Sequence, residues 1–325
     1  MGEMIQQTAL VPERQGGRRL DQVATGCFPD YSRSRVQSWI KSGALRVDGK
    51  QGRAKDKVRA RQVLTLIAEL ESDKRWEPEA IPLNIVFEDA HVLVINKPAG
   101  LVVHPGAGNY SGTLLNGLLH HEPALSKIPR AGIVHRLDKD TTGLMVVAKN
   151  LQAQANLVNQ LQARTVKREY EAVVQGLMTR GGNVEKPIGR HPSNRLKMGV
   201  IASGKYAATQ YRLIERYRAH THIKLQLETG RTHQIRVHMA HLRFPLIGDP
   251  LYGRSLRLPK KCGDTLKEQL QGFRRQALHA RQLGLIHPDT QKHMQWEVPL
   301  PDDMVALLVA LQQDRETIHE QTPGE

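Results

Sequence analysis

The sequence predicts an α+β fold in which a small basic module precedes a larger, sheet-based domain. Residues 83–311 contain several apolar or alternating segments of strand length, with segments of helical periodicity between them. Residues 18–75 instead combine two short helical patterns with a hairpin pattern. A charged stretch with two prolines lies between the two parts, and we place the linker at residues 76–82.

The beginning of the chain is expected to be irregular. Residues 1–17 are polar and show no sustained hydrophobic period, so we expect a flexible arm. A first helix is expected at residues 20–24, where apolar side chains keep helical spacing. A second helix is expected from a Ser32 cap to Gly43, which would end it.

A hairpin and a high positive charge complete the basic module. Residues 45–47 alternate like a strand, Asp48-Gly49 is a strong turn signal, and residues 62–68 predict the returning strand. Residues 31–61 contain ten Lys or Arg against two Asp. Such a surface attracts phosphate groups without choosing a base. The candidate side chains for binding a polyanionic partner are Arg33, Arg35, Lys41, Arg46 and Lys50.

The larger domain is expected to hold a mixed, mostly antiparallel sheet flanked by helices. The chain beyond it, residues 312–325, is polar and is expected to form a frayed tail. Strands are predicted at residues 91–96, 133–137, 143–148, 169–174, 207–213 and 222–227, and helices at 113–120, 151–164 and 232–242.

Composition favours a cytoplasmic protein with a polyanionic partner. The 325 residues carry a net charge of +15 and a pI near 10.0, well beyond what solubility requires. No long apolar run or signal-like N-terminal segment is present, so we expect neither membrane insertion nor export. Cys27 and Cys262 lie far apart and outside any CxxC pair, which indicates reduced thiols and no zinc site.

One short segment, residues 133–143, places a carboxylate in a rigid setting. Apolar residues lead into His135, Arg136 and Asp138, and turn-forming residues follow, so Asp138 is expected where a strand gives way to a loop. A lone aspartate in a loop is usually a cap or turn residue. The residue pattern by itself therefore leaves the role of Asp138 open.

The segment HRLDKDTTG (135–143) is very similar to the signature of the RluA/RluD pseudouridine synthases, with Thr142 where serine is common. Four other segments agree with that family in the same order along the chain. The residues SRSRVQSWIKSGALRVDGK also resemble the S4 RNA-binding domain, a match that covers residues 18–75. The four segments are NKPAGLVVHPG (96–106), REYEAVV (168–174), LETGRTHQIRVH (227–238) and GDPLYG (248–253).

The resemblance implies a cofactor-free isomerisation of uridine to pseudouridine. Asp138 would start it as a nucleophile at the ribose carbon or the uracil ring, or by assisting proton removal from the sugar. An enclosed carboxylate needs a nearby cation to stay ionised, and the resemblance assigns that role to Arg231. It also implies that Tyr170 stacks on the target uracil, although a core aromatic on a strand is the alternative.

The remaining candidates would bind substrate and not react with it. Arg136 is expected to fill the space left by a flipped base or to hold a phosphate. Leu227 and Ile235 would form apolar walls of the pocket or simply pack in the core. Lys97 and Arg236 are expected to contact phosphates. The histidines at 233, 238 and 241 do not have metal-ligand spacing, and we expect no metal; His135 is expected to be structural.

Three classes of function are compared. The first is a monomeric enzyme acting on 23S ribosomal RNA or a precursor of the large ribosomal subunit, and the resemblance suggests the hairpin known as helix 69. The second is a non-catalytic RNA-binding or assembly protein, and the third a metal-dependent hydrolase, for which residues 135–140 offer too few carboxylates. The basic stretch 254–275 is left open between a loop that selects RNA and a solvated surface insertion.

Overall fold

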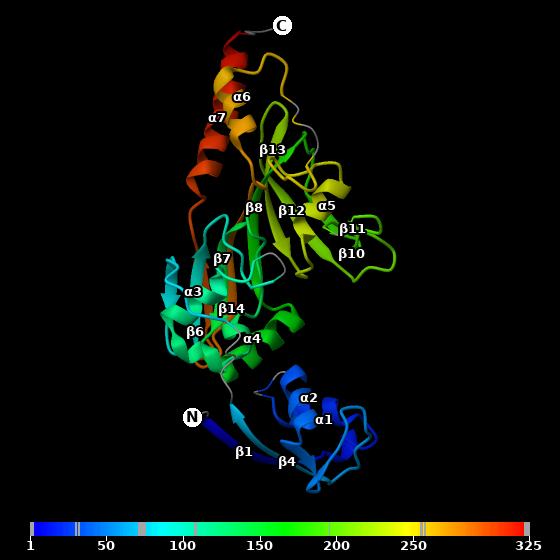
Figure 1. The fold of residues 1–325 in the computed structure, drawn as a ribbon. Helices are drawn as coiled ribbons and strands as arrows, with labels where there is room; N and C mark the ends of the chain where they lie inside the picture. Colours follow the sequence, from blue (N-terminus) through cyan, green and yellow to red (C-terminus); the bar gives the residue numbers. More distant parts are fainter. Residues whose placement is uncertain are drawn as a thin grey trace.

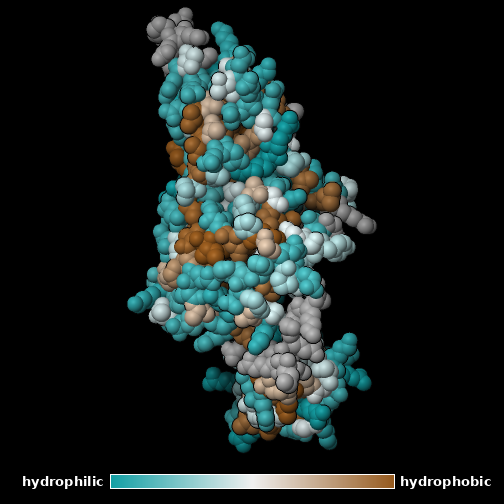
Figure 2. Space-filling view, turned by 60° about the vertical axis from the view of Figure 1, so that its left-hand side comes forward, coloured by the Kyte–Doolittle hydropathy of each residue, from teal (hydrophilic) through white to brown (hydrophobic). Residues whose placement is uncertain are grey.

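A small N-terminal module and a larger, elongated domain make up the protein (Figure 1). The computed structural model describes residues 3–29, 31, 33–70, 76–106, 109–194, 196–253, 256 and 258–321. Hydrophilic side chains cover most of the face drawn in Figure 2, and apolar side chains gather around its middle.

The N-terminal module is a four-stranded sheet covered by two helices. Its strands are β1 (Glu3–Leu10), β2 (Leu45–Val47), β3 (Lys50–Gln51) and β4 (Val63–Leu70), in the order β1-β4-β2-β3. The helices α1 (Leu20–Cys27) and α2 (Arg33–Ser42) confirm the two predicted helices, although Ser32 lies outside the described residues. A short 3-10 turn, η1 (Glu13–Gln15), precedes α1.

Two turns of this module follow from residues that accept positive φ. Asp48 and Gly49 have φ of 48° and 75°, which is the geometry of a two-residue hairpin turn, and they connect β2 to β3. Gly43, with φ of 80°, follows α2 directly. Both turn predictions are confirmed.

The expected flexible arm is wrong for residues 3–10. These residues form β1, which pairs with β4 through eight consecutive residues. Ile5 and Ala9 pack against the module's core, while Gln6 and Thr8, which alternate with them along the strand, are exposed. Only a few apolar side chains alternate with polar ones along this segment, so the sequence shows no clear strand period. The strand forms because it pairs with β4.

The larger domain is built on a nine-stranded sheet. Its order is β5-β6-β7-β14-β8-β13-β12-β9, with β15 paired to β14 beside this path. The pair β7–β14 is parallel and the other described pairs of this sheet are antiparallel. The strands are β5 (Ile85–Glu88), β6 (Val92–Lys97), β7 (Thr142–Ala148), β8 (Lys167–Gln175), β9 (Gly182–Glu185), β12 (Ala208–Arg216), β13 (His220–Leu227), β14 (Leu278–Ile286) and β15 (His293–Glu297).

Helices cover the sheet on both faces, which explains why its central strands are apolar without interruption. Along β6, Leu93 and Ile95 pack in the core with α3 (Leu114–His121), whereas Val92 and Val94 pack with α4 (Leu151–Ala163). The remaining elements are η2 (Pro123–Lys127), η3 (Pro129–Gly132), α5 (Gln234–His241), α6 (Asp264–Gly272), α7 (Asp302–Gln321) and the separate hairpin β10 (Ile188–Arg190) with β11 (Met198–Val200).

Two predicted segments of the larger domain and its linker differ in the structure. Residues 133–137 are not a strand, because only an isolated bridge from Ile133 to Val147 forms and the chain then turns away. Asp138 therefore precedes β7 in a loop and does not follow a strand. Residues 76–82 are attached to the larger domain: the Glu79 carboxylate accepts the Gly112 N–H at 3.0 Å, and Asn116 O accepts the Glu79 N–H.

The C-terminal helix also replaces irregular structure that the sequence led us to expect. α7 continues to Gln321, so residues 312–321 are helical and not a frayed tail. Asp314 on this helix is buried and accepts from Arg218 at 2.8 Å. The stretch 254–275 contains α6, whose Leu266 and Leu270 pack in one cluster with Leu307 of α7, so it is not merely a solvated insertion (Figure 1).

Candidate active site

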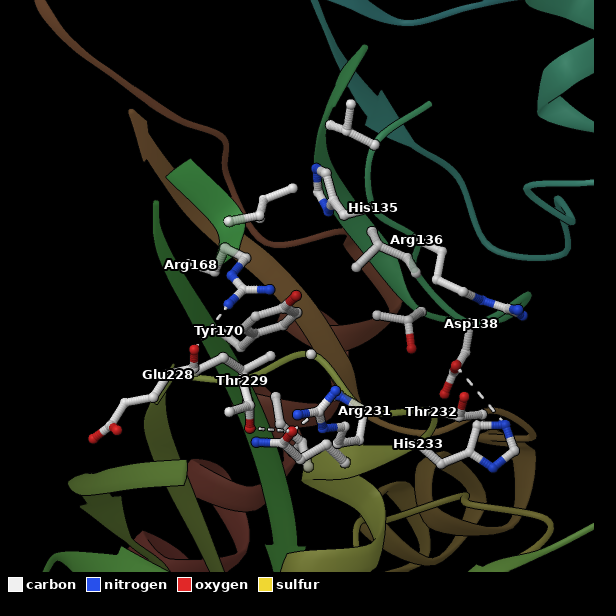
Figure 3. Close-up of a pocket in the computed structure, with 18 of the residues that line it drawn as sticks. His135, Arg136, Asp138, Arg168, Tyr170, Glu228, Thr229, Arg231, Thr232 and His233 are labelled. Atoms are coloured by element: carbon white, nitrogen blue, oxygen red, sulfur yellow. Dashed lines mark hydrogen bonds and ion pairs between the residues drawn. The ribbon is translucent and has the colours of Figure 1, made fainter. Parts of the chain in front are cut away.

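A cavity of about 580 Å³ opens between the loop before β7, strand β8 and the turn that leads from β13 into α5. This volume is within the range of about 300–1,000 Å³ usual for ligand sites. Figure 3 shows Asp138 on one side of the cavity and Arg168 with Tyr170 on the other. The predicted residues Arg136, Asp138, Tyr170, Leu227, Arg231 and Ile235 all line it.

The loop that carries Asp138 is held from beneath by Lys97. The Lys97 ammonium donates to the carbonyl oxygens of Pro98, Leu101 and Lys139 at 2.6–3.0 Å. All three N–H groups are thus used, and the residue is only 1% exposed. The prediction that Lys97 contacts phosphate is therefore wrong, because its charge is enclosed beneath the loop. Burial lowers the pKa of Lys97 to about 7, against the attraction of Asp140 and Asp138.

A second support comes from the segment before β14. Arg275 donates from Nε and Nη2 to the Asp303 carboxylate at 2.6 and 2.7 Å, and from Nη1 to Asp140 O at 3.3 Å. Gln276 donates to Thr141 Oγ1 at 2.9 Å. Arg275 is thus an internal contact that joins α7 to the Asp138 loop, not a free surface charge of the basic stretch.

The Asp138 carboxylate receives its ion pair from Arg236. Arg236 Nη1 donates to Asp138 Oδ2 at 2.9 Å, while Nε and Nη2 donate to the two oxygens of Asp249 at 2.7 and 2.9 Å. Asp249 is fully buried and also accepts the N–H groups of Leu251 and Tyr252. Although burial lowers the pKa of Arg236, the two carboxylates outweigh it and raise that pKa. Arg236 is therefore permanently charged and cannot serve as the predicted phosphate contact.

The prediction that Arg231 supplies the cation for Asp138 is wrong in this structure. Arg231 Nε donates to Tyr206 O at 3.0 Å, so its guanidinium is turned toward the start of β12. The backbone of the turn is fixed by the buried Gln234, which accepts from Arg231 N–H and from Thr229 Oγ1. Arg231 lies in the turn before α5 and Arg236 lies on the helix itself, and only the folded structure shows which of them reaches Asp138.

His233 forms a second contact with Asp138, and Tyr252 holds the His233 ring from its other side. His233 Nε2 lies 3.8 Å from Asp138 Oδ1, and His233 Nδ1 lies 2.7 Å from the Tyr252 hydroxyl oxygen. That oxygen accepts the Met198 N–H at 2.8 Å, so the hydroxyl proton is available for Nδ1. The neutral ring then carries its proton on Nε2, facing the carboxylate. Burial lowers the pKa of His233, which favours this neutral form.

The walls of the cavity combine one aromatic ring with aliphatic side chains. Tyr170, Leu227 and Ile235 are buried members of the main core cluster and also line the cavity. Arg136 is exposed at the rim, and no described residue forms a hydrogen bond or ion pair with it. His135 points inward and its Nε2 accepts the Val146 N–H at 3.0 Å, a structural role.

The five candidate RNA-binding residues of the basic module divide into two groups. Lys41, Arg46 and Lys50 are exposed. Arg33 donates to the buried carboxylate of Asp21 at 2.7 Å, and Arg35 donates to Lys127 O in the larger domain at 3.2 Å. Arg33 and Arg35 therefore bind residues distant along the chain, whereas Arg46 Nε donates to the nearby Gly43 O at 3.0 Å.

Sequence reasoning missed four residues that build the site: Arg168, His233, Asp249 and Tyr252. Each lies within or beside a segment that had been recognised, but nothing in a single sequence shows which side chains converge.

The histidines do not form a metal site: His238 bonds Thr209 and Lys186. Among the described residues, no three His, Cys, Asp or Glu side chains could hold a metal ion. No helix formed by the described residues is long and apolar enough to cross a membrane.

Comparison with known proteins shows the family to which this chain belongs. The family model described as RNA pseudouridylate synthase matches residues 91–241. Ribosomal large subunit pseudouridine synthase D of Pseudomonas aeruginosa is 57% identical over 97% of this chain and 99% of that protein. The chain belongs to the RNA pseudouridylate synthase family. The synthase D of Escherichia coli strain K12 is 53% identical over 97% of both chains.

Solved structures show the same fold. Human RNA Pseudouridylate Synthase Domain Containing 4 aligns with a TM-score of 0.55 and 27% identity, covering 70% of this chain and 93% of its own. Human RNA Pseudouridylate Synthase Domain Containing 1 aligns with the same TM-score and 23% identity, covering 76% and 98%. The α+β architecture with a mostly antiparallel sheet is confirmed.

Proposed function

We propose that this chain isomerises uridine to pseudouridine in the ribosomal RNA of the large subunit, with helix 69 as the target region. The observation that carries the proposal is Asp138, a carboxylate held by Arg236 at the edge of a cavity whose wall contains Tyr170. Relatives of 53–57% identity over nearly the full chain bear the name ribosomal large subunit pseudouridine synthase D.

The chemistry matches the geometry of Asp138. Its Oδ2 is engaged by Arg236, whereas Oδ1 faces the cavity at 3.8 Å from His233. We assign Oδ1 to the substrate, because Arg236 donates to Oδ2 and leaves the lone pairs of Oδ1 free to act as a nucleophile. Breaking the C1′–N1 bond, rotating the uracil and joining C5 to C1′ requires no net oxidation and consumes no water.

The cavity accepts a base only after the base has left its helix. Flipping a nucleotide costs a few kcal/mol, which contacts with the extruded base and its neighbours must offset. Tyr170 is proposed to stack on the uracil, and Leu227 and Ile235 to form its apolar walls. Arg136 at the rim is proposed to fill the vacated space or to hold a phosphate, and Arg231 to contact the nucleotide from the opposite wall.

The N-terminal module is proposed to be an S4-like RNA-binding domain. Its exposed Lys41, Arg46 and Lys50 would attract phosphates and bring structured RNA to the cavity. This contribution is independent of base identity, so selection of the target uridine is assigned to the larger domain.

The deciding experiment incubates the purified protein with unmodified large-subunit RNA and maps pseudouridine by chemical derivatisation and primer extension. We expect new pseudouridine with the wild type, and none with Asp138→Asn, which keeps the side-chain shape and removes the charge. RNA affinity should be unchanged in the variant. If the wild type forms no pseudouridine while still binding the RNA, the second candidate, a non-catalytic assembly protein, is correct.

A further inference from the structure

Arg168 is a second buried arginine in the same cavity, and the described part of the chain supplies no anionic partner for it. The residue is 7% exposed, and no carboxylate among the described residues forms an ion pair with it. Its Nη2 makes one long hydrogen bond, 3.4 Å, to Glu228 O. Its Nε is buried and lacks any hydrogen-bond partner in the described structure. Arg236, by contrast, binds two carboxylates.

The local structure holds Arg168 at this point. Along β8 every second residue faces the core, so Arg168 and Tyr170 project from the same face of the sheet. Figure 3 shows the guanidinium beside the tyrosine ring. On the other side lies Gly230: a side-chain carbon there would come within 2.9 Å of Arg168 Nη1. Glycine at 230 therefore leaves the space that the guanidinium occupies.

Burying a cation without a counter-ion lowers the free energy of unfolding. Removing a charge from water costs several kcal/mol unless an opposite charge or enough hydrogen bonds compensate. Burial lowers the pKa of Arg168, and the neighbouring Tyr170 opposes this only in part. The folded protein thus carries an unbalanced positive charge next to the ring against which the uracil is proposed to stack. The missing anion has to come from the substrate.

We propose that Arg168 stabilises the negative charge that develops on the uracil ring during isomerisation. This inference rests on the function proposed above. When the C1′–N1 bond breaks, its electron pair stays on N1, and the charge spreads over N1, O2 and O4. Asp138 forms the compensating bond to C1′. If Asp138 instead adds to C6, or a 2′ proton leaves, negative charge still develops on the ring.

The remaining steps restore the charge balance. The C5 carbon attacks C1′ and the bond between C1′ and the Asp138 oxygen breaks, which returns the carboxylate. C5 then loses its proton and N1 gains one, so no proton is consumed overall. Arg168 is needed only while the ring is negative, so its interaction is stronger in the transition state than with bound uridine.

A phosphate of a flanking nucleotide is the other anion that an RNA substrate supplies. A phosphate contact would add affinity and salt dependence without changing the chemical step. The burial of Arg168 beside Tyr170, deep in the cavity and away from its rim, favours the ring. An interaction of Arg168 with the uracil ring predicts a change in the rate constant, whereas an interaction with a phosphate predicts a change in RNA affinity.

The experiment compares Arg168→Met and Arg168→Lys with wild type under single-turnover conditions, on an RNA that contains the target hairpin. We expect Arg168→Met to lower the rate constant by about 100-fold, as for loss of one preorganised donor to a developing anion, with unchanged RNA affinity. Arg168→Lys should restore part of the rate. Arg180→Met, which removes an exposed arginine outside the cavity, is the matched control.

A modified substrate tests the charge directly. Fluorine at C5 of the target uridine withdraws electrons and stabilises a negative ring, so the Arg168→Met penalty on bond cleavage should shrink on that RNA. The melting temperature of Arg168→Met should equal or exceed that of wild type, because an unpaired buried charge is removed. A lower melting temperature with an equal penalty on both RNAs would make Arg168 structural.

Two other outcomes are also decisive. Weaker RNA binding with a smaller salt dependence and an unchanged rate constant would assign Arg168 to a phosphate and overturn the proposal. If wild type forms no pseudouridine under the same conditions, the function proposed above fails, which is distinct from failure of the Arg168 assignment.

Discussion

The Arg236 guanidinium donates to the Asp138 carboxylate at 2.9 Å, although 98 positions separate the two residues along the chain. The same guanidinium binds Asp249, so one arginine joins the loop before β7, the helix α5 and the turn that follows Ile247. The orientation of the reactive carboxylate therefore depends on a charge cluster assembled from three distant segments.

Substituting Arg236→Met should cost stability as well as activity. It leaves Asp249 fully buried without its counter-ion, and breaking such a pair costs about 3–5 kcal/mol. We expect urea unfolding to show this decrease in the free energy of unfolding. We also expect no detectable pseudouridine formation. Arg231→Met is the matched control: it loses one hydrogen bond to Tyr206 O and should cost about 1 kcal/mol. Equal losses for both variants would contradict the arrangement described here.

Removing both partners of the buried pair should recover stability but not activity. In Arg236→Met with Asp249→Leu, no unpaired charge remains at Asp249, and such replacements are often neutral or stabilising. We expect the double variant to be more stable than Arg236→Met alone and still inactive, because Asp138 lacks its cation. Additive destabilisation by the two substitutions in a double-mutant cycle would show that the pair is not coupled.

Lys97 should make stability depend on pH above neutrality. The folded protein releases the Lys97 proton near pH 7, whereas the unfolded chain releases it near pH 10.5. Between these values the unfolded chain binds more protons, so raising the pH stabilises the folded state through this group. The free energy of unfolding of wild type minus that of Lys97→Met should rise by up to about 1.4 kcal/mol per pH unit. A difference that stays constant between pH 7 and about pH 9.5 would refute this.

Tyr252 is predicted to position His233 and through it Asp138. Tyr252→Phe removes the hydroxyl that accepts from Met198 N–H and bonds His233 Nδ1, so the ring is free to change tautomer. We expect the single-turnover rate to fall about 10-fold, the equivalent of one hydrogen bond, with unchanged RNA affinity. The pH profile of the rate should also shift, which a purely structural loss would not produce.

The basic module offers a comparison between a free and a paired cation. Lys41→Ala should leave stability unchanged and reduce the slope of log affinity against log salt by about 1. Although burial raises the pKa of Asp21, hydrogen bonds from Arg33, Gln37 and Arg19 outweigh it and lower that pKa to about 2. Arg33→Met should therefore destabilise folding by about 1 kcal/mol, since Gln37 and Arg19 remain. A salt slope unaffected by Lys41→Ala would exclude it from RNA binding.

Local patterns in the sequence were sufficient for most of the architecture. The two helices of the module, its Asp48-Gly49 turn and the apolar strands β6, β7 and β8 follow from periodicity and turn chemistry that neighbouring residues specify. β1 and the end of α7 were mispredicted because their polar sequences form regular structure only against a partner, β4 for the strand and, through Asp314, Arg218 for the helix.

The features of the site also fall into those that the sequence predicts and those that only the folded chain determines. The sequence by itself determined that Asp138 lies in a loop, that Tyr170 is on a strand, and that the chain is strongly basic, but it wrongly predicted a strand directly before Asp138. Only the tertiary structure decided that Arg236 and not Arg231 pairs with Asp138, that Lys97 is enclosed beneath the loop, and that no described carboxylate pairs with Arg168. The reason is physical: ion pairs and burial depend on distances between side chains, and residues far apart in the chain acquire those distances only by folding.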